Sequence, residues 1–297
     1  MTHTDAPDVE SSLERGLPIS LSRNTDVAHW YMGWLRECVD RGWVMAPDPQ
    51  QILPVRWSLD PDDVHSLFFW TKWSKHLREA LGSWLDPYRV FVAFTITGWE
   101  EVETRVPSLD AQLDEFSRLV DLVGPHRVAW RYSPIPTHIH SDISAQARLT
   151  RTASRLSKLG IDRVDVSLMQ PSPHWSEGYA PEGQEGVEER ARRDALEMVW
   201  HVTRHFGIKV GVCADDARFL SNLPSDGFYA TECVDRQRLD DAFDLDTGAV
   251  SECGCACQMT IDPCQGPQFG CASACEYCYV AYTKPPNSEF HRRRCDE

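Results

Sequence analysis

Three cysteines near the end of the 297-residue chain have the spacing of a metal-binding motif. Cys271, Cys275 and Cys278 are separated by three and two residues, and the aromatic Tyr277 precedes the last of them. Three thiolates spaced in this way can bind three irons of one four-iron, four-sulfur (Fe4S4) cluster and leave the fourth iron open. An open iron is typical of a reactive cluster, because a cluster that only transfers electrons normally has four cysteine ligands.

A structural zinc site is the alternative for the same cysteines. Zinc usually binds two Cys-x2-Cys pairs in a tetrahedral set, and here only Cys275 and Cys278 form such a pair. Seven of the eleven cysteines lie between residues 253 and 278. Such crowding of soft ligands, in a chain without an export signal, indicates a metal or a cluster rather than disulfides. The spacing favours an iron–sulfur cluster, with a zinc-stabilised interaction module as the other reading.

Strand-like and helix-like stretches alternate before the cysteine-rich part. Short apolar runs predict strands over residues 17–21, 66–70, 91–97, 127–132, 163–168 and 209–213. Helical spacing follows Asp26 and recurs over residues 109–123, 145–159 and 187–206. This order predicts an α/β fold with a parallel sheet, a partial or full (β/α) barrel, followed by a C-terminal cysteine-rich iron–sulfur segment.

We expect three parts along the chain: a flexible tail over residues 1–16, a barrel-like domain over 17–217, and a cluster-binding segment over 218–297. The alternation fades after Ala217, and residues 251–297 show no strand or helix pattern. Residues 170–186 predict a long surface loop or a lid. The net charge of −15 argues against a nucleic-acid partner, and no apolar run or signal peptide indicates a membrane, so a cytoplasmic location is expected.

Several segments together resemble the domain of unknown function 1848 family, whose cysteine motif resembles that of radical S-adenosylmethionine enzymes. The matching segments are Ser22–Asp26, Phe69–Lys72, Phe94–Gly98, Trp130–Tyr132, Cys213–Ala214, Cys233–Asp235 and Cys253–Cys255, followed by the motif itself at the C-terminus. Two local departures stand out. Ser273-Ala274 occupies the place of a His-Gly pair, and Cys257 and Cys264 are additional.

This resemblance implies an enzyme in which the cluster binds S-adenosylmethionine. One-electron reduction, by a partner such as flavodoxin or ferredoxin, would then cleave a carbon–sulfur bond. The usual product is a 5′-deoxyadenosyl radical, acting here on a small-molecule biosynthetic substrate. Transfer of a 3-amino-3-carboxypropyl group is one alternative. A non-catalytic electron carrier or redox sensor is another, and it would need a fourth ligand, for which Cys264 is the candidate.

The resemblance also implies an auxiliary iron–sulfur cluster. Its expected ligands are Cys213, Cys233, Cys253 and Cys255, and Cys257 or Cys264 could replace two of them. Cys213 could instead be an ordinary buried thiol at a strand end.

Polar residues follow several predicted strands, at the edge where parallel α/β folds carry their working face. Together with Tyr277 they form the expected cofactor-binding set: Arg23, Thr25, Asp26, Lys72, Thr97 and Arg131. Buried cations are costly unless they are paired or bind a ligand. They could therefore bind the carboxylate and amine of S-adenosylmethionine, or the substrate. An internal ion pair, such as Asp26 with Arg131, is the structural alternative.

Overall fold

Eight strands of the computed structural model form one parallel sheet, in the order β10-β1-β4-β5-β6-β7-β8-β9. The structure describes residues 17–22, 24–46, 54–135, 142–169, 185–223, 227–232, 234, 236–243, 259–263 and 271–278. The strands are β1 (Leu17–Leu21), β4 (Val64–Thr71), β5 (Val90–Thr95), β6 (Val128–Ile135), β7 (Arg163–Leu168), β8 (Lys209–Cys213), β9 (Phe228–Thr231) and β10 (Met259–Ile261). A separate antiparallel pair joins β2 (Trp43–Ala46) to β3 (Val55–Ser58). The predicted α/β class with a parallel sheet is confirmed.

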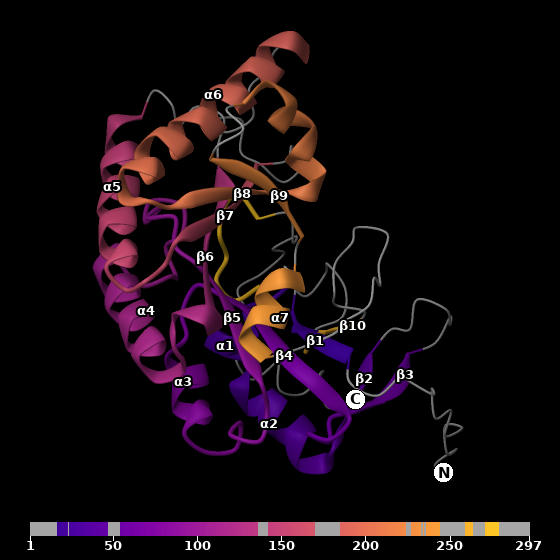
Figure 1. Cartoon of the computed structure of the whole chain (residues 1–297). Helices are drawn as coiled ribbons and strands as arrows, with labels where there is room; N and C mark the ends of the chain where they lie inside the picture. Colours follow the sequence, from indigo (N-terminus) through magenta and orange to yellow (C-terminus); the bar gives the residue numbers. More distant parts are fainter. Residues whose placement is uncertain are drawn as a thin grey trace.

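The helices are α1 (Val27–Trp30), α2 (Met32–Arg41), α3 (Lys75–Leu81), α4 (Leu109–Val123), α5 (Ile143–Ser157), α6 (Glu185–Thr203) and α7 (Arg236–Phe243). They follow the strands, and α3 to α6 cover the outer face of the sheet (Figure 1). The side chains of Ser108 and Asp142 cap α4 and α5, each accepting a hydrogen bond from a backbone N–H in the first turn. None of the helices in these ranges has the length and apolar character needed to cross a membrane.

The two faces of the sheet bury different apolar clusters. In β5, Val92 and Phe94 join the large core with α4, whereas Phe91 and Ala93 point to the opposite face. On that opposite face they pack with Leu239 of α7, so α7 lies on the inner side of the sheet (Figure 1). Because β5 is buried on both faces, all six of its residues are apolar or small.

The strand β7 places a charged residue on the inner face of the sheet. Its burial alternates along the strand, with Val164, Val166 and Leu168 buried in the core. The alternate residues therefore face inward, and among them is Asp165. The two-residue alternation of β7 therefore places polar side chains on the inner face of the sheet.

Part of the sequence prediction for the C-terminal region is wrong. The strand–helix alternation continues beyond Ala217 through β9 and α7, and β10 pairs in parallel with β1. Residues 251–297 therefore contain a strand, and the sheet extends across the expected boundary at residue 217. These strands have only four and three residues, which is too short for a periodic pattern. The predicted tail over 1–16 and residues 170–184 of the predicted loop lie outside the described residues.

Candidate metal centre

The cysteine loop, residues 271–278, packs against the segments that follow β1 and β5. The indole Nε1 of Trp30 donates to Ser273 Oγ at 3.0 Å, and the backbone N–H of Glu276 donates to the Val102 carbonyl at 3.0 Å. Arg105 also reaches the loop, with its Nη1 3.4 Å from the Ala272 carbonyl oxygen. The loop thus lies at the carboxyl-end edge of the parallel sheet, where such folds carry their ligands.

Two tight turns shape the cysteine loop. The N–H of Ala274 donates to the Cys271 carbonyl, and the N–H of Cys278 donates to the Cys275 carbonyl, both at 3.0 Å. Ala274 has a φ of 46°, in the left-handed region that glycine adopts without cost. The backbone conformation therefore explains why a glycine is expected at this position of the motif.

The three thiols of the loop are partly buried and lie close enough to influence one another. Burial raises the pKa of Cys271 to about 11, while backbone N–H groups of Ser273 and Asp26 donate to its sulfur and oppose the rise. Burial also raises the pKa of Cys275, and the charges of Cys271 and Cys278 add to the rise. A metal that replaces the thiol protons would compensate for this crowding of negative charge.

Within the described ranges, no three Cys, His, Asp or Glu side chains converge closely enough to hold one metal ion. The five described cysteines, including Cys38 and Cys213, are all free of disulfides.

Asp26 has a positioning role beside this loop. Its carboxylate accepts hydrogen bonds from Thr71 Oγ1 at 2.7 Å, from the Lys72 N–H at 2.8 Å and from the His29 N–H at 3.0 Å. Burial raises the pKa of Asp26 to about 6. The side chain joins the end of β4 to the start of α1, and its own backbone N–H meets Cys271.

Thr25 takes part in a second connection, between β1 and β10. Its hydroxyl donates to Asp262 Oδ1 at 3.3 Å, and the Ser22 hydroxyl donates to the other oxygen of that carboxylate. Asp262 follows directly after β10 and is buried. These hydrogen bonds fix the end of β10 beside the end of β1, ahead of the cysteine loop in the sequence.

Lys72, Thr97 and Tyr277 converge on Glu103, a residue that the sequence analysis did not select. Lys72 Nζ lies 2.9 Å from Glu103 Oε1, Thr97 Oγ1 donates to the same oxygen at 2.7 Å, and the Tyr277 hydroxyl also donates to it. The Lys72 ammonium lies 5.8 Å from the centroid of the Tyr277 ring. An internal ion pair therefore exists at this edge of the sheet, and it joins Lys72 to Glu103.

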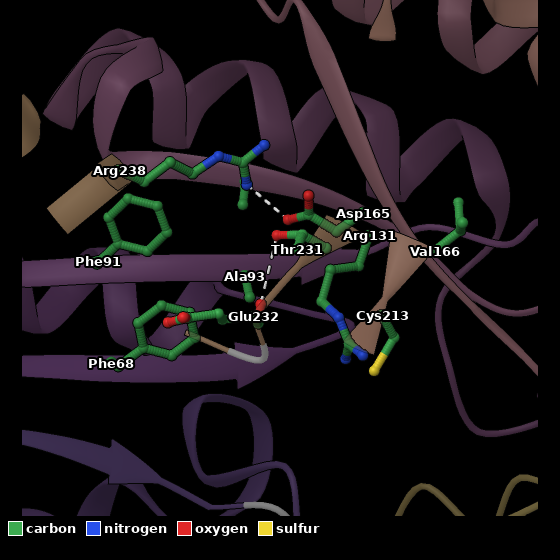
Figure 2. Close-up of a pocket in the computed structure, with 11 residues that line it drawn as sticks. Phe68, Phe91, Ala93, Arg131, Asp165, Val166, Cys213, Thr231, Glu232 and Arg238 are labelled. Atoms are coloured by element: carbon green, nitrogen blue, oxygen red, sulfur yellow. Dashed lines mark hydrogen bonds and ion pairs between the residues drawn. The ribbon is translucent and has the colours of Figure 1, made fainter. Parts of the chain in front are cut away.

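Arg131 and Cys213 lie in a separate pocket on the inner face of the sheet. Figure 2 shows the guanidinium of Arg131 and the sulfur of Cys213 on one side of the pocket, opposite the ion pair of Asp165 and Arg238. Arg238 Nη1 lies 2.6 Å from Asp165 Oδ2, and the Arg131 guanidinium stacks 4.6 Å above the Trp70 ring. The remaining polar lining comes from the end of β9 and the residue after it, Thr231 and Glu232.

The predicted site residues thus fall into two groups. The cysteine loop has Thr25, Asp26, Lys72 and Thr97 beside it, whereas Arg131 and Cys213 line the inner pocket. The other predicted ligands lie outside the described residues: Arg23, Cys233, Cys253 and Cys255, together with Cys257 and Cys264. Cys38 belongs to α2 and is fully buried on the face of that helix that packs into the core.

Sequence reasoning missed three acidic residues of these sites. Glu103 lies in a loop with Glu100 and Glu101, so its composition resembles that of an exposed acidic turn. Asp262 adjoins a strand too short to detect, and Asp165 is one of the alternate polar residues of β7. The alternation of polar and apolar residues in β7 is the one available signal, because it places Asp165 on the face opposite the core.

The sequence matches one protein family over most of its length. The model of the family described as Domain of unknown function (DUF1848) matches residues 19–280. No curated protein matches the sequence. A xylose isomerase domain protein from Planctomyces limnophilus is 12% identical, with a TM-score of 0.33, over 60% of this chain and 68% of that one. A mutant O-GlcNAc hydrolase from Thermobaculum terrenum is 14% identical, with a TM-score of 0.38, over 63% of this chain and 48% of that one.

Proposed function

We propose that this chain, which belongs to the family described as Domain of unknown function (DUF1848), is a radical S-adenosylmethionine enzyme. The observation that carries the proposal is the cysteine loop itself, with three neighbouring thiols, none of them in a disulfide, at the carboxyl-end edge of a parallel sheet. Cys271, Cys275 and Cys278 would hold an Fe4S4 cluster with one open iron. When bound and reduced, that cluster supplies the electron that cleaves S-adenosylmethionine to methionine and a 5′-deoxyadenosyl radical.

The protein contributes the position and the surroundings of the three thiolates. Backbone N–H groups of Asp26 and Ser273 donate to the Cys271 sulfur, which stabilises its thiolate form. Trp30 and Arg105 hold the loop from two sides through Ser273 and Ala272. Because the thiols are partly buried, water is partly excluded from the face on which the radical would form.

The inner pocket is the place where we expect the organic ligands to bind. Arg131 presents a guanidinium 4.6 Å from the centroid of the Trp70 ring, and its planar set of donors suits a carboxylate of S-adenosylmethionine or of a small-molecule substrate. The apolar part of the lining, Phe68, Phe91 and Ala93, would contact an uncharged part of the ligand. The side chains of Lys72, Thr97 and Asp26 are engaged within the protein and are assigned a positioning role instead.

An auxiliary cluster is the second part of the proposal. Cys213 ends β8 at the inner pocket and is partly exposed, as a ligand thiol there would be. Cys233, Cys253 and Cys255 would complete its ligand set. Such a cluster would lie beside the Arg131 side of the pocket, close to a bound substrate.

A spectroscopic experiment tests the open iron. The protein is reconstituted anaerobically with iron and sulfide, reduced, and measured by electron paramagnetic resonance with and without S-adenosylmethionine. The signal of the cluster at Cys271 should change on addition, because the ligand binds the open iron. An unchanged signal with full iron content would indicate four protein ligands and support an electron carrier.

A further inference from the structure

A single buried carboxylate oxygen connects three segments of the candidate metal centre. Glu103 Oε1 accepts from Lys72 after β4, from Thr97 after β5 and from Tyr277 of the cysteine loop. We propose that Glu103 is a positioning residue that holds the cysteine loop on the sheet, and that Glu103 and Lys72 shift the reduction potential of its cluster in opposite directions. This inference rests on the proposed cluster and says which two residues set its reduction potential.

The burial of both charges makes their electrostatic effects large. The side chain of Glu103 is 3% exposed and that of Lys72 is 14% exposed, so water screens neither charge well. Their separation of 2.9 Å makes the pair a tight one, and Thr97 and Tyr277 satisfy the carboxylate further. Removal of one partner would leave the other charge buried and uncompensated.

Both charges lie against the cysteine loop. Tyr277 stands between the ligands Cys275 and Cys278, and its hydroxyl donates to Glu103 Oε1. The Lys72 ammonium lies 5.8 Å from the centroid of the Tyr277 ring and 2.9 Å from the same carboxylate oxygen. An electron added to a cluster held by this loop would therefore experience one nearby positive charge and one nearby negative charge.

Lys72 and Glu103 should shift the reduction potential of the cluster in opposite directions. Lys72 stabilises the reduced cluster and should raise its potential, whereas Glu103 destabilises it and should lower its potential. The change Glu103→Gln should therefore raise the potential, and Lys72→Met should lower it. In the double variant the two changes should largely cancel. A purely structural role could alter stability and iron content, but it would not produce shifts of opposite sign.

The experiment is a redox titration of the reconstituted full-length protein, followed by electron paramagnetic resonance. The melting temperature of the metal-free protein is measured in parallel, because the positioning role does not require the cluster. Glu103→Gln should lower that melting temperature and make iron loss to a chelator at least severalfold faster. The matched control is Glu115→Gln, since Glu115 is also buried but bonds to Ser74 and to Arg78 at 2.9 Å on the α3 side. The Glu115→Gln variant should lower the melting temperature and leave the reduction potential of the cluster unchanged.

Opposite shifts for the two single variants, with cancellation in the double variant, are the expected result. Shifts in the same direction, or no shift with iron retained, would overturn the proposal. If Lys72→Met alone loses its iron, the double variant should regain it, because both buried charges are then gone. No regain would count against the proposal. A wild-type protein that binds no iron would instead overturn the proposed function, which separates the two failures.

Discussion

Trp30 and Ser273 form a hydrogen bond that joins the first helix to the cysteine loop across 243 positions of sequence, with the indole Nε1 3.0 Å from the serine hydroxyl. Trp30 is 41% exposed, and its ring stacks on His29 with ring centroids 4.0 Å apart. This residue therefore contributes little to the core. Its contact instead helps to fix the segment between Cys271 and Cys275.

The first prediction concerns that hydrogen bond. Trp30→Phe keeps an aromatic ring on His29 but removes the donor, at a cost of about 1 kcal/mol. We expect iron loss to a chelator to become about fivefold faster, with little change in melting temperature, since ~1.4 kcal/mol corresponds to a factor of ten. Ser273→Ala should have the same effect, and the double variant should add nothing. Additive effects would show that the two side chains do not act through each other.

The second prediction concerns the left-handed conformation of Ala274. A non-glycine residue in this region costs roughly 1–2 kcal/mol, so Ala274→Gly should relieve strain in the loop. We expect slower release of iron from the reconstituted protein, measured against the same chelator. Ala272→Gly is the matched control, because Ala272 has no such conformation and its buried methyl group would be lost. Faster release from the Ala274→Gly variant would contradict the strain argument.

The third prediction separates the two arginines of the inner pocket. Arg131→Met should weaken binding of S-adenosylmethionine or substrate about tenfold or more, because a charge-assisted hydrogen bond contributes roughly 1.5–3 kcal/mol. Its melting temperature should change little. Arg238→Met should instead lower the melting temperature strongly, because it leaves Asp165 without its 2.6 Å partner in a buried site. Calorimetric binding and thermal unfolding of both variants provide the comparison. Large melting shifts with intact binding for Arg131→Met would remove that residue from the ligand site.

The fourth prediction concerns the auxiliary cluster at Cys213. Two Fe4S4 clusters would give close to eight irons per chain after anaerobic reconstitution. The triple change of Cys271, Cys275 and Cys278 to Ala should leave about four irons, and a further Cys213→Ala should reduce that remainder. No residual iron in the triple variant would return Cys213 to the status of a structural thiol at the end of β8.

The sequence predicted those features that depend on local patterns. The bounds of β1, β7, β8 and α4 agree with their apolar runs, because each run is bounded by clear polar or glycine signals. The cysteine motif was located because its spacing lies within eight residues. In contrast, β9 and β10 were not predicted, because strands of four and three residues are too short to show a periodic pattern.

The features that the sequence did not predict depend on contacts between residues far apart in the chain. Glu103 cannot be distinguished from Glu100 in sequence, although Glu100 caps the start of α4 by accepting from the Leu109 N–H at 2.7 Å. Glu103 gains its role because Lys72, Thr97 and Tyr277 approach it from other segments of the chain. Similarly, the sequence placed Asp26 and Lys72 at one edge of the sheet, but their partners come from segments 45 and 31 residues away.

The most direct test of the account is the cleavage of S-adenosylmethionine by the reconstituted protein under a strong reductant. We predict that anaerobic incubation yields methionine and 5′-deoxyadenosine in a reductant-dependent reaction, as measured by chromatography and mass spectrometry. Cys271→Ala, Cys275→Ala and Cys278→Ala should each abolish the products while the sheet stays folded. A fully loaded wild-type cluster that leaves S-adenosylmethionine intact, or wild-type turnover in any of the three variants, would contradict the account.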